Sequence, residues 1–310
     1  MDIVKVNAEL VQCNSEFNTM LNRFVQYVDV SQSSIRSYIF GVKAFLRYIS
    51  ERNINTPTRN TVIEYKKHLS ETKSASTIAL YLSALRRFFS WTSSEGLYTD
   101  ITTGIKSPRV DNGHKRDALS APQLKKIISG IENKTLKGKR DFAIFCLTAA
   151  TGLRTCEVVR SDISDIRTVG GETCLFIQGK GKTSKADFVK LTSHVMRAIR
   201  TYLDARGEVS ENEPLFASLA RRNYGKRMTT RSVSRICKAA MCSAGFNSSR
   251  YTAHSLRHSA ITLALIQGMS IQEVSQFARH SNISVTMIYS HDVERMKSRC
   301  ESVISSAIFE

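Results

Sequence analysis

The sequence predicts a mainly α protein: a helical N-terminal domain, then a mostly helical second domain that holds a small antiparallel β-sheet. Apolar residues recur at steps of three and four along most of the chain, which is the period of one helix face. Glycine and proline are few, at 15 and 4 of 310 residues, so little interrupts such helices. Only 173–191 holds two short strand-like runs around a turn-rich segment.

Three amphipathic patterns fill the first hundred residues. The stretch 31–52 carries one apolar stripe, formed by Ile35, Tyr38, Ile39, Val42, Phe45, Leu46 and Ile49. A shorter helix starts near Thr58 and runs to 69. Ser74 then precedes a third pattern over 75–91, which ends near Gly96. This part of the chain is therefore expected to be a small helical bundle.

The helical pattern stops over 104–116, a polar, basic stretch that holds Pro108 and is typical of an exposed linker. We therefore expect three parts, bounded as 1–106, 107–117 and 118–310.

A capping box at Ser120 and Gln123 begins the helices of the second domain. An apolar helix over 142–150 follows and closes at Thr151-Gly152. The strands 173–178 and 187–191 flank the basic turn segment GKGKTSKA, as in a hairpin. Further helices are expected at 193–206, 229–244, 253–267, 270–278 and 284–291. The last twenty residues are amphipathic, with an apolar face formed by Met296, Val303, Ile304 and Ile308.

The chain is strongly basic, with 45 Lys+Arg against 27 Asp+Glu, a net charge of +18 and a pI near 9.8. This favours a polyanionic partner, most simply nucleic acid. An anionic membrane is the alternative, but it would need a polybasic run beside an apolar anchor. The sequence has no long apolar segment, and MDIVKVNAEL does not resemble a signal peptide. A soluble, cytoplasmic protein is expected.

The seven cysteines are scattered, odd in number and never spaced as C-x-x-C. Zinc sites need ligand pairs that this pattern lacks. We therefore expect reduced thiols, no metal and no cofactor.

Cleaving a phosphodiester without a metal requires cations for the phosphate, a nucleophile in line and an acid for the departing oxygen. Residues of these kinds occur in suggestive contexts. Arg154 follows the Thr151-Gly152 turn and opens a helix, where backbone N–H groups favour an anion. His254, Arg257 and His258 share one helix face. The others are Lys180 on the hairpin tip, His280 and Tyr289.

Each of these residues alone has an ordinary alternative. A single arginine is usually a surface ion-pair partner, and a Lys-Gly turn is usually a solvated loop. A histidine on an amphipathic helix is usually structural, and a tyrosine near a helix end often keeps its hydroxyl in water. Together, in this order, the residues favour chemistry.

Three blocks carry a resemblance to the tyrosine recombinase family, which includes phage integrases and the Xer chromosome-dimer resolvases. They read ATGLRTCEVVRSDISDI (150–166), LFIQGKGKTSKADFVKL (175–191) and YTAHSLRHSAITLALIQGMSIQEVSQFARHSNISVTMIYSHD (251–292). The resemblance implies a catalytic set of Arg154, Lys180, His254, Arg257, His280 and the nucleophile Tyr289, with Glu157 in support. Lys182 and Lys185 are alternatives to Lys180.

The sequence departs from the family pattern at two places. Ala278-Arg279 stands where the family usually has Leu-Gly, which puts an extra cation beside the site, and Lys190 stands in place of a proline. The first domain resembles the family's core-binding, SAM-like domain, which forms a C-shaped clamp around DNA with the catalytic domain. We expect no further N-terminal module.

The resemblance implies that Tyr289 forms a 3′-phosphotyrosine and releases a 5′-hydroxyl, with Lys180 as general acid and His254 handling the tyrosine proton. Neither ATP nor metal would be needed. Four protomers on two double-stranded DNA sites would exchange strands through a Holliday junction, with or without accessory proteins. The product could be integration, excision or dimer resolution. The tail after His291 would dock on a neighbouring protomer, or pack on its own domain.

Two helices hold cations that could read DNA, since an α-helix fits the major groove. They are Arg86 and Arg87 on one helix, and Arg231, Arg235 and Lys238 on the other. Phosphate contacts or plain surface positions are the alternatives.

Two other functions compete with recombination. A type IB topoisomerase would use nearly the same chemistry on one duplex, but the T-G-L-R block and the first domain argue against it. A DNA-binding regulator that kept the fold should lack a catalytic residue, and none is missing.

Overall fold

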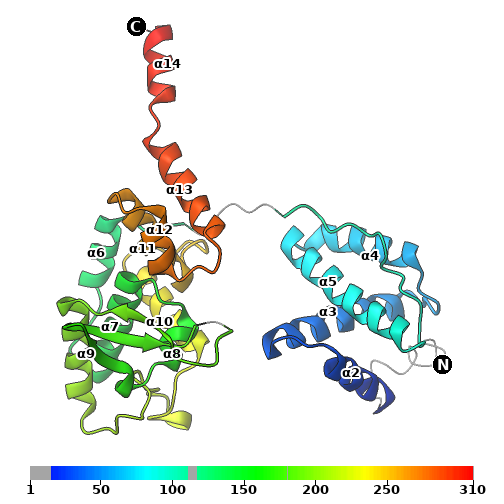
Figure 1. Cartoon of the computed structure of the whole chain (residues 1–310), viewed down its shortest axis with the longest axis horizontal. Coiled ribbons are helices and arrows are strands. Elements are labelled where there is room, and N and C mark those ends of the chain that lie inside the picture. The colour runs from blue at the N-terminus through cyan, green and yellow to red at the C-terminus, as the bar shows by residue number, and fades with distance from the viewer. Residues whose placement is uncertain (1–14, 111–116, 180, 310) are drawn as a thin grey trace. The chain divides into compact units, whose positions relative to one another are not determined.

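The structure is a computed structural model, and it describes residues 15–110, 117–179 and 181–309. The chain divides into two compact units, Met1–Asn112 and Gly113–Glu310, called here the first and the second unit. Figure 1 shows the helices of the first unit and the mixed architecture of the second. Within the described ranges, no helix is long and apolar enough to cross a membrane.

The first unit is a bundle of α2 (Ser15–Tyr27), α3 (Gln32–Glu51), α4 (Arg59–Thr72) and α5 (Ala75–Ser94). The hydroxyls of Ser31 and Ser74 accept from the third backbone N–H of α3 and α5, which fixes both starts. The three sequence-predicted helices are confirmed. Helix α2 was not predicted as a separate element.

Helices α3 and α5 pack closely in the first unit because Gly41 has no side chain. A Cβ atom at Gly41 would lie 2.9 Å from the Cβ of Ala84. The core behind this contact is aromatic, with the rings of Phe24 and Phe88 packed edge to face at 5.4 Å and Trp91 beside them. Large buried rings of this kind stabilise a bundle of modest size.

The second unit consists mainly of helices, with bounds α6 (Ala121–Ser129), α7 (Leu136–Thr151), α8 (Thr155–Arg160), α9 (Ser193–Arg206), α10 (Thr230–Ser243), α11 (Ala253–Ile266), α12 (Ile271–Ala278), α13 (Ser284–Lys297) and α14 (Cys300–Phe309). The capping box of Ser120 and Gln123 is confirmed. Helix α7 begins earlier than the sequence predicted, because the Thr135 hydroxyl accepts from Gly138 N at 3.1 Å. Helix α13 extends past the predicted end at 291.

The sheet has three antiparallel strands in the order β1 (Ile166–Val169), β2 (Glu172–Ile177) and β3 (Asp187–Lys190). The predicted hairpin is confirmed, with Ile177 opposite Asp187. The third strand, β1, was not predicted. Three of the four residues of β1 are exposed, so it lacks the apolar alternation that marks a strand.

A main core fills the space between the sheet and helices α6 to α11 of the second unit. A smaller cluster lies between α11, α12 and α13 and includes Ile261, Val274 and the ring of Tyr289. Helices α11, α12 and α13 therefore pack on one another through this cluster, and Tyr289 is part of it.

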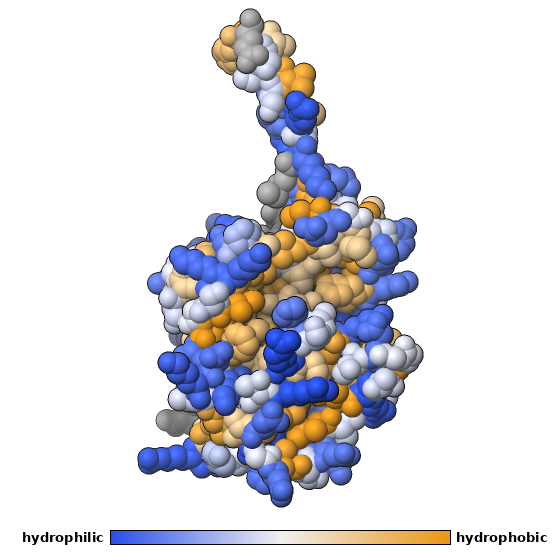
Figure 2. Space-filling model, turned by 90° about the vertical axis from the view of Figure 1, so that its left-hand side faces the viewer, coloured by the Kyte–Doolittle hydropathy of each residue, from blue (hydrophilic) through white to orange (hydrophobic). Residues whose placement is uncertain are grey.

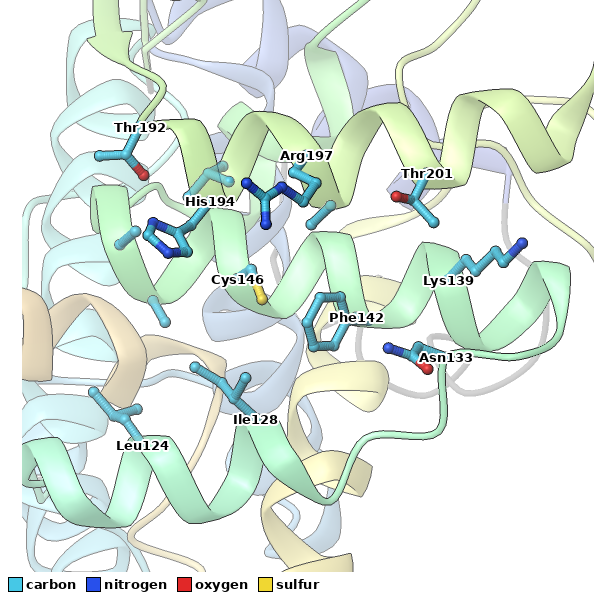
Figure 3. A pocket seen from close by; sticks show the side chains of 14 residues that line it. Leu124, Ile128, Asn133, Lys139, Phe142, Cys146, Thr192, His194, Arg197 and Thr201 are labelled. Atoms are coloured by element: carbon cyan, nitrogen blue, oxygen red, sulfur yellow. The ribbon is translucent and has the colours of Figure 1, made fainter.

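A mostly apolar groove of about 610 Å³ lies between α6, α7 and α9, and is called here the α6–α9 groove. Figure 3 shows Ile128 from α6, Phe142 and Cys146 from α7 and His194 from α9 around it. Figure 2 shows hydrophobic residues gathered on this face of the second unit.

Candidate active site

The turn between α7 and α8 places Arg154. Helix α7 ends at Gly152, whose backbone is left-handed (φ +60°), and Arg154 then caps α8. The Glu157 carboxylate accepts from the Arg154 backbone N–H at 2.8 Å and from its Nη1 at 3.0 Å. Glu157 is fully buried, whereas the Arg154 side chain keeps 27% exposure. Glu157 thus fixes the Arg154 guanidinium on one side, and the other side of the guanidinium is open to solvent.

Arg257 lies on α11 and is almost fully buried. Its Nη1 donates to the Gly152 carbonyl at 2.8 Å, and its Nη2 donates to the Ala278 carbonyl. Burial lowers the pKa of Arg257 to about 10, and the nearby positive charges of Arg154 and Arg279 act in the same direction. The guanidinium still carries its charge at neutral pH.

His280 follows α12, and its Nδ1 lies 2.8 Å from the Thr286 hydroxyl. Burial lowers its pKa to about 4, and Arg257, Arg154 and Arg279 add to the effect. The ring is therefore neutral at neutral pH. If Nδ1 accepts from Thr286, the Nε2–H can donate to a substrate oxygen.

Tyr289 lies on α13 and is 5% exposed. Its ring packs against His258, with centroids 4.7 Å apart, and stacks near His280 at 6.3 Å. Burial raises the pKa of the Tyr289 hydroxyl, although Arg257 and Arg154 oppose this. The phenol is therefore protonated at neutral pH, and a phenol in this state must lose its proton to become a good nucleophile.

These side chains line one cavity of about 400 Å³, called here the Tyr289 cavity. Its walls include every predicted catalytic residue that the structure describes, namely Arg154, His254, Arg257, His280 and Tyr289. Lys180 lies outside the described residues. A nucleophile beside convergent guanidinium groups is what metal-free phosphoryl transfer needs.

The sequence profile of the "Phage integrase family" matches residues 117–296, and that of the "Phage integrase, N-terminal SAM-like domain" matches residues 21–96. The chain belongs to the phage integrase family of tyrosine recombinases. It is therefore an enzyme that breaks and rejoins DNA by site-specific recombination through a tyrosine.

Curated relatives agree along most of the chain. The tyrosine recombinase XerC of Herpetosiphon aurantiacus is 30% identical over 285 residues, which cover 87% of this chain and 90% of XerC. The tyrosine recombinase XerD of Lacticaseibacillus casei is 29% identical over 276 residues, which cover 86% of this chain and 92% of XerD.

Solved structures of tyrosine recombinases share the fold. The XerH site-specific recombinase in a post-cleavage complex with palindromic difH gives a TM-score of 0.72 at 20% identity, covering 96% of this chain and 86% of XerH. A dimer of lambda integrase residues 75–356 bound to a COC′ core site gives a TM-score of 0.65 at 17% identity, covering 86% of this chain and 95% of the integrase chain.

The lysines of the recombinase hairpin differ in their surroundings. Lys182 lines the Tyr289 cavity, and its Nζ contacts the Asp187 carboxylate at 2.7 Å. Lys185 is held by Asp162 and Asp165 and is not among the residues that line the cavity. Of the two alternatives to Lys180, Lys182 is thus better placed.

The predicted DNA-reading cations fall into two groups. Arg86 donates to the Ile105 carbonyl, and Lys238 donates to the carbonyls of Asn247, Ser248 and Tyr251, so both hold loops of their own unit. The remaining three are exposed, namely Arg87, Arg231 and Arg235.

Two residues near Tyr289 were not assigned a role from the sequence. His258 was placed on the face of His254 and Arg257, and it packs directly on Tyr289. Arg279 was noted only as an extra cation, and it lines the cavity beside Glu157. The departure from Leu-Gly was the available signal for Arg279. Within the described ranges, no cluster of three metal-ligating side chains occurs.

Proposed function

We propose that the Tyr289 cavity binds the scissile phosphate and that Arg154, Arg257 and His280 hold its nonbridging oxygens. The observation that carries this proposal is the placement of Tyr289 in one cavity with both guanidinium groups. Arginine suits the task because its planar fork bonds two phosphate oxygens and keeps its charge.

In the cleavage step, the Tyr289 oxygen attacks phosphorus and the bond to the 5′ oxygen breaks. This forms a 3′-phosphotyrosine and a 5′-hydroxyl. Lys180 donates the proton to the departing oxygen, with Lys182 as the alternative because it lines the cavity. His254, an exposed residue of the same cavity, accepts the tyrosine proton. Attack by the 5′-hydroxyl of another duplex reverses these steps, so no ATP is consumed.

The proposed partner is a pair of double-stranded recombination sites in the cytoplasm, held by four copies of the chain. A structure of a lambda integrase tetramer bound to a Holliday junction supports this assembly by analogy of fold. In this proposal the domain 1–106 is the core-binding domain, and the domain 118–310 is the catalytic domain.

In the same proposal, three exposed arginines contact DNA, namely Arg87, Arg231 and Arg235. A mobile-element origin fits the same chemistry.

The nucleophile is tested with nicked duplexes tiled across the DNA that flanks the gene. The nick lets the cleaved end diffuse away, so the covalent adduct accumulates and is seen on a denaturing gel. Wild type should give an adduct in the presence of a chelator, and Tyr289→Phe should give none while it still binds DNA. An adduct that survives Tyr289→Phe would refute the assignment of the nucleophile.

Strand exchange separates the proposal from its two rivals. A recombinase should join strands from two duplexes that carry the cleaved site. A type IB topoisomerase would relax supercoiled DNA without exchanging strands. A regulator would bind the site and give neither product.

The C-terminal helix α14 supports the proposed tetramer. None of its described side chains is buried, and Val303, Ile304 and Ile308 are each more than half exposed. We propose that this face packs on the α6–α9 groove of a neighbouring copy, because both surfaces are apolar and neither is covered by other described residues.

This packing is tested by placing charges on α14. Ile304→Asp with Ile308→Asp should leave binding to a single site intact and abolish assembly on two sites, measured by gel filtration of the DNA complexes. Ser302→Asp with Ser306→Asp puts the same charges on the opposite face of α14 and should assemble normally. Equal assembly by both double variants would overturn the proposed contact.

A further inference from the structure

Arg279 ends helix α12 in a left-handed conformation, with φ 54° and ψ 47°. Within the described ranges, Asn53 is the only other residue besides glycine with a positive φ. Such a backbone is strained for a residue with a side chain and persists only where the surroundings enforce it. The recombinase pattern usually has glycine here, so this chain keeps a strained arginine where an unstrained residue would fit.

The guanidinium of Arg279 is fixed in the wall of the Tyr289 cavity. Its Nη1 donates to the Phe277 carbonyl at 2.7 Å, and its Nη2 lies 3.3 Å from Glu157 Oε2. The side chain is only 10% exposed, and its Nε has no hydrogen-bond partner among the described residues. Burying an arginine with an unsatisfied donor is costly, so another requirement must keep it there.

Glu157 connects Arg279 to the catalytic arginine. Its Oε1 accepts from Arg154 Nη1, and its Oε2 accepts from the Arg154 backbone N–H and pairs with Arg279. Without Arg279, the buried carboxylate would have Arg154 as its only charged partner at bonding distance among the described residues. The positive charge of Arg154 would then be largely cancelled before a phosphate entered the cavity.

We propose that Arg279 is a positioning residue that neutralises Glu157, so that Arg154 presents a full positive charge to the scissile phosphate. This inference rests on the proposed function of the Tyr289 cavity.

The charges of the three arginines and Glu157 show why this matters. Arg154, Arg257 and Arg279 carry +3 and Glu157 carries −1, which leaves +2; without Arg279 the sum is +1. A phosphodiester carries one negative charge. Once the Tyr289 proton has left, the five-coordinate phosphorus group carries two. The fixed charges of these four side chains therefore match a dianionic phosphorus group when Arg279 is present and only a monoanionic group when it is absent.

The test is the rate of adduct formation by Arg279→Gly under single-turnover conditions with saturating protein. We expect cleavage to slow by about tenfold or more, since tenfold corresponds to a small change in the barrier. Glycine relieves the backbone strain, so the melting temperature should not fall. Arg279→Lys keeps the charge and should recover part of the rate. Asn53→Gly relieves the same kind of strain at an exposed site in the first unit and should cleave like wild type.

A second substrate separates charge from structure. A methylphosphonate linkage at the scissile position replaces one charged oxygen by a methyl group, so the reacting group carries one negative charge less. If Arg279 supplies charge, Arg279→Gly should lose much less rate on this neutral linkage than on the phosphodiester. Equal losses on both linkages, or wild-type rates by Arg279→Gly, would overturn the inference and leave the proposed function intact. Absence of any wild-type adduct would overturn both.

Discussion

The charge of His280 is decided by its neighbours. The ring lies among the three arginines of the cavity, and burial with these positive charges lowers its pKa to about 4. A histidine in this state can donate a hydrogen bond but does not carry charge at neutral pH. In the proposed site, the negative phosphate is therefore held by the arginines, with His280 as a neutral donor.

This charge state can be followed by NMR titration of the ring in Tyr289→Phe, which prevents cleavage. In the DNA-free protein, the midpoint should be near pH 4, well below the ordinary 6.5. Bound DNA puts a negative charge beside the ring and should raise the midpoint. Since the unfolded chain takes up this proton at higher pH than the folded chain, stability should fall as the pH drops from 6.5 to 4. A midpoint near 6.5 without DNA would contradict the described environment.

Residue identities were predictable at the site because the catalytic blocks have a fixed order and local context. Arg154, Arg257, His280 and Tyr289 come together in the cavity as those blocks imply. The role of Arg279 could not be predicted, because it depends on a carboxylate more than a hundred positions earlier in the chain. Contacts between α8 and the end of α12 exist only in the folded unit.

At the scale of elements, the turn from α7 to α8 joins Arg154 and Arg257, two arginines that line the Tyr289 cavity. Gly152 has a left-handed backbone, and its carbonyl accepts from Arg257 while Arg154 lies two residues further on. The geometry of one turn therefore sets the spacing of both guanidinium groups.

Gly152→Ala tests this turn. A Cβ atom there would meet Ala260 and Phe277 at an ordinary 3.5 Å, so the cost is mainly backbone strain, about 1–2 kcal/mol. We expect the free energy of unfolding of the second unit, measured with urea, to fall by that amount, and the adduct to form more slowly. Gly170→Ala is the control, because Gly170 has φ +57° and nothing within 4 Å. Gly170→Ala should lose a similar free energy of unfolding and cleave DNA at the wild-type rate. Equal rates of cleavage by Gly152→Ala and Gly170→Ala would argue against a role of the turn.

Helices with an apolar stripe and a serine or threonine at the N-cap position were predictable to within a few residues, as α3, α5 and α9 show. Strand β1 was not, because a short, exposed strand is defined by its partner β2 rather than by its own pattern. The early start of α7 depends on a cap at Thr135 outside the apolar run. Elements stabilised mainly by pairing or capping are those that a sequence pattern misses.

At the scale of the whole molecule, two units with separate cores share one strongly basic chain. The first unit packs around an aromatic core. The second unit packs around two apolar clusters, and the smaller of them includes Tyr289. The net charge of +18 far exceeds the charge of the side chains that line the Tyr289 cavity. Most of this charge is therefore available to hold DNA phosphates.

The salt dependence of DNA binding tests whether both units contribute. Removing one cation that neutralises a phosphate should reduce the slope of log K against log salt by about 0.9, because fewer counterions are released. We expect this reduction for Arg87→Gln in the first unit and for Arg231→Gln in the second, and about twice this value, roughly 1.8, for the double variant. Fluorescence anisotropy on one labelled site gives the slopes. If only Arg231→Gln changed the slope, Arg87 would not contact a phosphate, and the contribution of the first unit to binding would have to come from other residues.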